Sequence, residues 1–208
     1  MSRVFVYSGS GISKCYFPYL SRIFQKIEYV DNLDFLSNNT HLPCDILYIG
    51  GGRGKHVLEN LTSQNVLLLK DNILKRKIRY IGVCCGAYLV GKKIVFDNTS
   101  KNTLGLCDVT SIGPYYKPTD SFYDYSKDNS ILLSSSILAT NQNVKVYLNG
   151  GGWFDTFPEN YEIISYYENS CLPNTITNNQ MFLTHIHPEH PDTHQYFAKL
   201  IKTFVERI

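Results

Sequence analysis

Two adjacent cysteines, Cys84 and Cys85, lie in the segment Gly82-Val83-Cys84-Cys85-Gly86, directly after an apolar run. This G-x-C-x-G pattern is the thiol counterpart of the G-x-S-x-G nucleophile elbow, in which a strand turns sharply into a helix. Glycines two residues to either side keep such a turn free of side-chain clashes. The pattern predicts that Cys84 is a nucleophile at the apex and that the backbone N–H of Cys85 points toward a developing oxyanion.

These few residues leave two alternatives open. A glycine-flanked bend that buries two inert thiols would have the same sequence. Cys85 is the weaker candidate nucleophile, because Val83 stands where the shifted pattern needs its leading glycine. A helix that begins near Gly86 would present its positive dipole end to a thiol at position 84.

A thiol needs a general base or a positive neighbour to react at neutral pH. The candidate base lies in His187-Pro188-Glu189, where a carboxylate follows an imidazole by two residues. Residues with this spacing in an extended chain project to the same side, so Glu189 can hold the ring nitrogen that His187 does not use. The sequence therefore predicts a catalytic triad of Cys84, His187 and Glu189.

Crowded histidines are also a signature of metal binding. Four lie within ten residues, at His185, His187, His190 and His194. They show no recognised metalloenzyme spacing, and two prolines between them argue against a helix that carries ligands one turn apart. We predict neither a metal nor another cofactor, with a metal site as the alternative.

The first of two glycine runs, Gly50-Gly51-Gly52, follows the predicted strand that ends at Ile49. It does not open a P-loop, because Ile49 and His56 stand where that motif needs glycine and Ser or Thr. Backbone N–H groups of Gly51 or Gly52 could instead join that of Cys85 around a tetrahedral intermediate.

The second run, Asn149-Gly150-Gly151-Gly152, allows close backbone approach to a ligand, although a plain turn explains it equally well. We expect oxyanion or substrate binding from residues of both runs and from positions that follow the nucleophile. They are Gly51, Gly52, Cys85, Tyr88, Asn149, Gly150 and Gly151.

Expected strands are 4–7, 45–49, 79–83, 93–96, 144–148, 161–166 and 181–184, and expected helices are 16–25, 65–76 and about 193–205. Their alternation in the first half predicts a mostly parallel sheet with helices on both faces. The polar stretch 118–130 is expected to be a surface loop. Reactive groups of parallel sheets collect at the carboxyl ends of strands, and both the cysteine pair and the histidine segment fall there.

Composition fits one globular domain over residues 1–208, with 43% hydrophobic residues. The net charge of +2 predicts no nucleic-acid or membrane partner, and no apolar run approaches the length of a membrane span. Cysteine spacing fits neither a disulfide framework nor a zinc ribbon, and no signal peptide is visible, so we expect reduced thiols in the cytoplasm. The expected partner is a small-molecule substrate or ligand; a homodimer or a protein partner stays open.

Five motifs in this order carry a resemblance: the opening strand and glycine turn 4–11, the glycine loop 49–52, the cysteine elbow 82–88, the second glycine run 147–152, and His187-Pro188-Glu189. Together they resemble the N-terminal domain of eukaryotic biotin–protein ligases, within the class I glutamine amidotransferase-like superfamily. The resemblance spans nearly the whole chain. It implies a flavodoxin-like three-layer α/β sandwich with a mostly parallel central sheet, and the triad Cys84, His187 and Glu189.

Two departures narrow what the resemblance implies. Glutaminases of the superfamily usually carry glutamine shortly after the elbow, and Tyr88 in this chain argues against glutamine as the substrate. No biotin ligase catalytic domain fits in the 208 residues, so biotinylation is not predicted. We expect a cysteine-dependent hydrolase or amidotransferase-like enzyme that acts on an amide or related carbonyl. The alternatives are a non-catalytic binding module that uses the same cleft and a redox or electrophile sensor built on Cys84.

Overall fold

The structure is a computed structural model that describes residues 3–38, 45–75, 78–115, 130–168 and 170–206. The surface loop expected at 118–130 lies outside these residues except for Ser130, and so does Cys44. Every other element and site residue expected from the sequence is described, apart from the last residues of the helix expected at 65–76.

A nine-stranded sheet forms the centre of the molecule, in the order β2-β1-β3-β4-β13-β12-β11-β8-β9. Its first half is parallel: β2 (Glu28–Val30), β1 (Val4–Tyr7), β3 (Asp45–Ile49), β4 (Ile78–Val83) and β13 (Met181–Thr184). Its second half is antiparallel: β12 (Pro173–Thr177), β11 (Glu162–Tyr167), β8 (Ser130–Ile137) and β9 (Gln142–Asn149). The predicted α/β fold is confirmed, but the central sheet is mixed rather than mostly parallel, because every pairing in its second half is antiparallel. The parallel half carries the predicted nucleophile.

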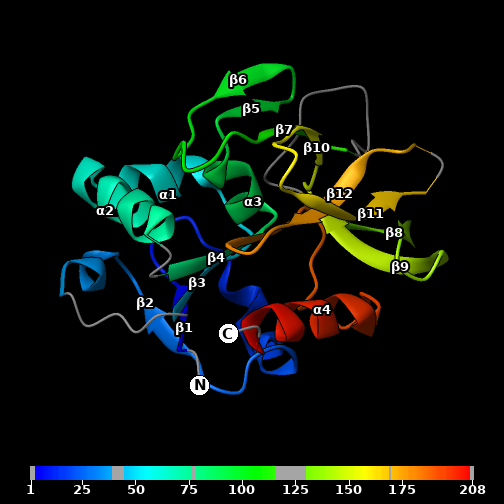
Figure 1. Cartoon of the computed structure of the whole chain (residues 1–208), viewed down its shortest axis with the longest axis horizontal. Helices are drawn as coiled ribbons and strands as arrows, with labels where there is room; N and C mark the ends of the chain where they lie inside the picture. The colour runs from blue at the N-terminus through cyan, green and yellow to red at the C-terminus, as the bar shows by residue number, and fades with distance from the viewer. Residues whose placement is uncertain (1–2, 39–44, 76–77, 116–129, 169, 207–208) are drawn as a thin grey trace.

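Helices cover both faces of the parallel half (Figure 1). One face carries α1 (Gly54–Asn60), α2 (Ser63–Leu74) and α3 (Cys85–Val90), and the other carries α4 (Gln195–Glu206) and the 3₁₀ helix η1 (Lys14–Arg22). Alternation along the strands supplies the two cores: Phe5, Leu47 and Tyr80 face α1–α3, whereas Val6, Ile46 and Ile81 face α4. The result is the predicted three-layer sandwich.

A second sheet of four strands extends from the α3 side of the molecule (Figure 1). Its order is β10 (Trp153–Thr156), β7 (Thr110–Gly113), β5 (Lys93–Phe96) and β6 (Thr99–Lys101). The hairpin of β5 and β6 turns through Asp97 and Asn98, both at positive φ, as two-residue hairpin turns require. The remaining 3₁₀ helix is η2 (Asp34–Asn38).

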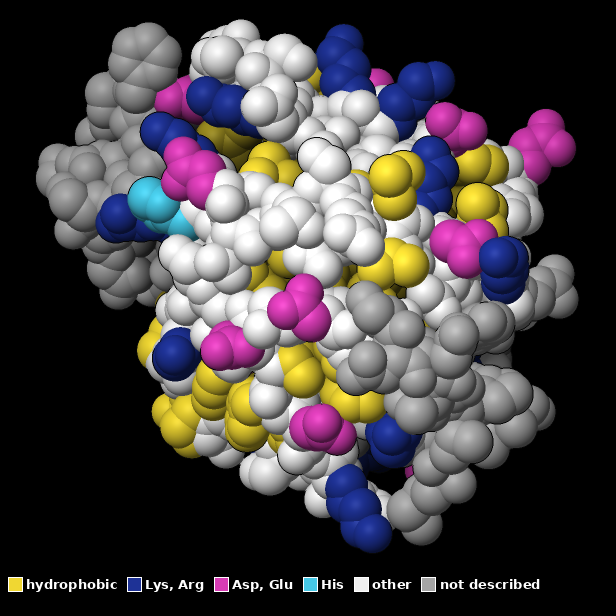
Figure 2. Space-filling view, turned by 90° about the vertical axis from the view of Figure 1, so that its left-hand side faces the viewer, with side chains coloured by type: hydrophobic (Ala, Val, Ile, Leu, Met, Phe, Trp, Pro, Cys, Tyr) yellow, Lys and Arg dark blue, Asp and Glu magenta, His cyan; other side chains and the backbone are white. Residues whose placement is uncertain are grey.

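Several elements differ from those expected. The helix expected at 16–25 is η1, a 3₁₀ helix, and Pro18 lies inside it without the backbone N–H that an α-helix would use. The helix α1 was not expected, because a single residue of it, Val57, is buried and no apolar period marks it. On the face in Figure 2, side chains of both charge signs are interspersed, in line with the small net charge. Within the described residues, no helix combines the length and apolarity needed to cross a bilayer.

The last helix is attached to the strand that leads to Cys84. Its residues Phe197, Ala198, Ile201 and Phe204 are buried. At its carboxyl end the guanidinium of Arg79, on β4, donates to the backbone oxygens of Phe204 and Val205, the latter at 2.8 Å. A cation at the carboxyl end of a helix is favourable, because free carbonyl groups collect there. This contact fixes α4 under β4 and, with it, the segment that leads into α4.

Ile201 is fully buried. Its replacement by alanine should lower the free energy of unfolding by about 2–5 kcal/mol, because the missing side-chain atoms leave a cavity where the helix packs against β4. The matched control is Lys202→Ala, one residue on and exposed, which should change it by less than about 0.5 kcal/mol. Urea unfolding would measure both. Equal effects of the two changes would contradict the placement of α4.

Candidate active site

Cys84 lies at a sharp corner between β4, which ends at Val83, and α3, which begins at Cys85. Its backbone has φ 48° and ψ −103°, a region that side-chain-bearing residues avoid at a cost of about 1–3 kcal/mol. The N–H of Cys84 donates to Thr184 O at 2.8 Å, and its carbonyl accepts from the N–H of Tyr88 at 3.0 Å. The corner is thus held from both sides, by β13 and by the first turn of α3.

The flanking glycines are required by close packing. A Cβ atom on Gly82 would lie 2.9 Å from Ala87 N, and one on Gly86 would collide with the backbone oxygen of Ile49. Any side chain at either position would push α3 away from β3 and β4. The predicted G-x-C-x-G turn is therefore formed, with Cys84 at its apex.

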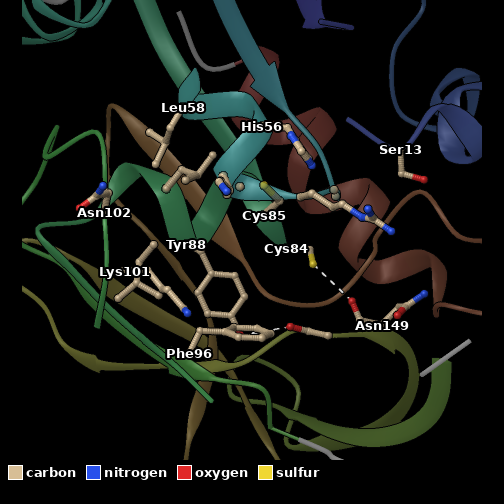
Figure 3. A pocket seen from close by; sticks show the side chains of 18 of the residues that line it. Ser13, His56, Leu58, Cys84, Cys85, Tyr88, Phe96, Lys101, Asn102 and Asn149 are labelled. Atoms are coloured by element: carbon tan, nitrogen blue, oxygen red, sulfur yellow. Dashed lines mark hydrogen bonds between the residues drawn. The ribbon is translucent and has the colours of Figure 1, made fainter. Parts of the chain in front are cut away.

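The Cys84 thiol faces a cavity of about 920 Å³ and donates to Asn149 O at 3.4 Å (Figure 3). Cys84 as a whole is 6% exposed. Cys85 also borders the cavity, but burial and the charge of Cys84 raise the pKa of Cys85 far above its ordinary value. At neutral pH Cys85 is therefore a protonated thiol, which makes it a poor nucleophile.

His187 lines the same cavity and lies next to Glu189 in space. Its Nδ1 is 2.8 Å from Glu189 Oε1, and both side chains are almost completely buried. The ring is stacked on Tyr16 with centroids 4.5 Å apart, and the His187 N–H donates to Tyr147 O at 3.1 Å. A Cβ on Gly51 would lie 2.6 Å from His187 Cε1, so glycine at this position makes room for the imidazole.

Burial alone would lower the pKa of His187, but the Glu189 carboxylate and the neighbouring Cys84 outweigh it and raise this pKa to about 10. The imidazolium is therefore the favoured form at neutral pH. Nε2 is buried without a hydrogen-bond partner among the described residues, although Cys84 is near enough to influence the ring. Catalytic hydrogen bonds are often long or poorly aligned before substrate binds.

Glu189 has two neighbours that the sequence did not point to. The Tyr48 hydroxyl lies close to it: burial and then the Glu189 charge raise the pKa of Tyr48 well above its ordinary value. Arg22 donates to the backbone oxygen of Glu189 at 3.1 Å. Tyr48 lies in the strand expected at 45–49 and Arg22 in the helix expected at 16–25, so no local pattern marked either of them as a neighbour of Glu189.

The first glycine run forms a tight loop beside the cysteine corner. Ser13 N donates to Gly51 O at 2.9 Å, and Arg53 N donates to Gly11 O at 2.7 Å, which fixes the loop to the turn after β1. Gly51, Gly52 and Cys85 all line the cavity. Their N–H groups donate to no acceptor in the described part of the chain, so they are available to a bound oxyanion.

The second run is divided between two roles. Asn149 and Gly150 line the cavity, whereas Gly151 packs against the backbone oxygen of His185 and does not. The expected substrate-binding role of Gly151 is therefore not supported by its position. Tyr88 does line the cavity, and its hydroxyl donates to Gly150 O at 3.2 Å. That bond holds the run against α3.

The other histidines do not converge with His187. His185 is buried between the rings of Tyr88 and Phe154, and burial lowers the pKa of His185 to about 3, so it is neutral. His190 stacks on Tyr147 with centroids 3.7 Å apart. Within the described ranges, no three His, Cys, Asp or Glu side chains are grouped as metal ligands would be.

Comparisons with known proteins show which family and fold this chain resembles. The sequence profile of the family described as "Biotin-protein ligase, N terminal" matches residues 2–199. An uncharacterised protein of Chlamydia muridarum is 26% identical over 183 residues, which cover 78% of this chain and 68% of that protein.

Two solved structures are similar in fold. A crystal structure of a glutamine amidotransferase superposes with a TM-score of 0.68 at 16% identity, over 95% of this chain and 98% of that chain. The structure of PurLQS from Thermotoga maritima superposes with a TM-score of 0.62 at 11% identity, over 98% and 97% of the two chains. At such low identity they establish the fold alone, and the profile match over nearly the whole chain establishes the family. The chain belongs to the biotin-protein ligase N-terminal domain family and has the fold of class I glutamine amidotransferases.

Proposed function

We propose that the chain, as one domain over residues 1–208, is a cysteine-dependent hydrolase or amidotransferase-like enzyme that cleaves an amide or related carbonyl compound. It would have no biotin ligase activity of its own. The observation that carries the proposal is that the strained Cys84 corner borders the same cavity as His187, which is buried and paired with Glu189. Strained backbone and perturbed pKa values collect at active sites more than elsewhere.

The first half of the reaction acylates Cys84. Cys84 reacts as a thiolate beside the His187 imidazolium, and the thiolate attacks the carbonyl carbon to form a C–S bond. The carbonyl oxygen becomes an oxyanion, and the N–H groups of Gly51, Gly52 and Cys85 stabilise it. When the intermediate collapses, the C–N bond breaks and the leaving nitrogen takes the proton from His187.

The second half releases the acyl group. Neutral His187 takes a proton from water, whose oxygen attacks the thioester carbon. Collapse of this second intermediate breaks the C–S bond and returns Cys84 to a thiolate beside the His187 imidazolium. The net change is amide plus water to carboxylic acid plus amine; an amine in place of water would give transfer rather than hydrolysis.

Glu189 acts through His187 rather than on the substrate. Its carboxylate accepts a hydrogen bond from Nδ1–H, which leaves Nε2 for proton transfer, and its charge favours the imidazolium. Tyr16 stacks on one face of the ring and Gly51 lies beside its Cε1 atom, so the imidazole is held before substrate arrives.

The second candidate function is a binding module that uses the same cavity without chemistry. The bond from the Cys84 thiol to Asn149 O, rather than to His187, favours it. A module of this kind would bind its ligand without a covalent adduct, whatever the ligand is.

Cys84→Ala should abolish modification of the active-site peptide by iodoacetamide at pH 7, whereas Cys85→Ala should leave it largely intact, because the buried Cys85 thiol stays protonated. Cys15 and Cys171 are exposed and will also react, so the modification must be assigned by peptide mass spectrometry. Equal modification of the remaining thiol in the two variants would reject Cys84 as the activated cysteine.

Glu189→Gln should lower the pKa of His187, because the negative charge that raises it is removed. Without the Glu189 charge, burial should bring this pKa below 7, so Cys84 loses its cationic neighbour at pH 7 and the labelling rate should fall about tenfold or more. The pH profile of Cys84 labelling should move to higher pH. Rates measured from pH 5 to pH 10 would test this.

The matched control is Asp192→Asn, an exposed carboxylate of the same segment that lies 3.7 Å from His190. It should leave the rate and the pH profile of Cys84 labelling unchanged. If the two variants behave alike, Glu189 has no particular coupling to the nucleophile.

A further inference from the structure

The cavity beside Cys84 has one apolar wall. Its side chains come from three elements that are distant in sequence: Leu58 of α1, Tyr88 and Leu89 of α3, and Ile94 and Phe96 of β5. Figure 3 shows Leu58, Tyr88 and Phe96 along one side of the hollow, with Cys84 and Asn149 on the other. The volume of about 920 Å³ suits a ligand of ordinary metabolite or drug size rather than a very small one.

The charged side chains around the cavity are mostly basic. Three cations border it, Arg53, Lys55 and Lys101, against one carboxylate in the described lining, Glu59. Glu59 is already engaged, 3.8 Å from the Lys55 ammonium and 3.3 Å from His56 Nδ1. The cavity therefore favours an anion and offers no uncommitted carboxylate to a ligand ammonium.

Lys101 is placed to meet that anion next to the apolar wall. It lies on β6 directly across from Ile94 of β5, so both side chains project from the same face of the hairpin. Figure 3 shows Lys101 on the side of Tyr88 away from Cys84. A chain that starts at Cys84 and follows the apolar side chains would end near the Lys101 ammonium.

We propose that the acyl group transferred to Cys84 is an apolar chain that ends in an anion and carries no ammonium, as in the monoamide of a dicarboxylic acid. The inference rests on the proposed function for the carbonyl that reacts. The apolar wall takes the methylene groups, and Lys101 takes the terminal carboxylate. Glutamine fits poorly, since its α-ammonium would lie among cations with Glu59 already paired.

The test measures binding to the Cys84→Ala protein, which cannot turn over the ligand. Ligand-observed NMR titrations at low salt would compare glutaramate, adipamate and suberamate with the neutral amides pentanamide, hexanamide and octanamide. Glutaramate and glutamine form a further matched pair that differs only by the α-ammonium. We expect the anionic amide to bind more tightly than its neutral partner, by up to about fivefold, the range of a solvent-exposed ion pair, and glutaramate to bind more tightly than glutamine.

Lys101→Met in the same background should remove the preference for the anion at the chain length where it is largest. Lys93→Met is the matched control, because Lys93 is an exposed cation of the same hairpin, outside the cavity lining, and its side chain projects from the opposite face. It should leave the preference unchanged.

No preference for the anion at any chain length would overturn the inference, as would a preference that both lysine variants lose equally or glutamine binding as tightly as glutaramate. Catalysis is judged separately with the wild-type protein and the same amides. If the preference holds while wild type hydrolyses none of them, the enzyme proposal fails and the ligand class stands. If the wild-type protein hydrolyses the neutral amides as well as the anionic ones, the proposed anionic ligand class is wrong and the enzyme proposal stands.

Discussion

The conformation of one residue, Cys84, is the constraint on which the site depends. Its positive φ turns the chain from β4 into α3 within a single residue, so the thiol stands at the end of the sheet and borders the cavity. Such a conformation persists only where the surroundings fix it. Here the bond to Thr184 O and the close packing of Gly86 on Ile49 fix it from two neighbouring strands.

The second requirement is a buried ion pair. His187 and Glu189 lie almost out of contact with water, where separate charges would be costly. Their pairing makes burial acceptable, and the segment that carries them is tied down along β9. The N–H of His187 donates to Tyr147 O, and the N–H of His194 donates to Lys145 O. Thr193 Oγ1 accepts from the N–H of Tyr147. These bonds also cover the outer edge of β9, which would otherwise present free backbone groups. One set of contacts thus protects the sheet edge and holds the imidazole.

Local patterns predicted Cys84, His187 and Glu189 as the candidate site residues, and the structure brings these three close together. In G-x-C-x-G, Gly82 avoids contacts with residues a few positions away, whereas Gly86 packs against Ile49 of a neighbouring strand. His187 and Glu189 are two residues apart, so their relation follows from extended geometry alone. Tyr16, Tyr48 and Lys101 approach the site from three other elements, and only the sheet order brings them there. No pattern in a single segment contains that order.

The antiparallel half of the sheet was partly missed for a different reason. β8 and β12 carry serine, threonine and asparagine where a buried strand normally shows apolar residues. These polar side chains bond to one another inside the sheet: Ser165 Oγ donates to Asn174 Oδ1 at 2.6 Å, and Asn174 Nδ2 donates to Ser135 Oγ at 2.9 Å. In these strands, hydrogen bonds between buried polar side chains take the place of apolar burial. A segment rich in serine, threonine and asparagine is typical of a loop, so the sequence did not predict the two strands.

Trapping the covalent intermediate tests the central claim most directly. The protein would be mixed with the p-nitrophenyl ester of a simple acid, quenched in acid within the first turnovers, and digested for peptide mass spectrometry. The account predicts one acyl group on the peptide that contains Cys84, attached as a thioester that hydroxylamine removes, and none in the Cys84→Ala protein. Ester turnover that continues undiminished in Cys84→Ala, or an acyl group found only on another residue, would contradict it.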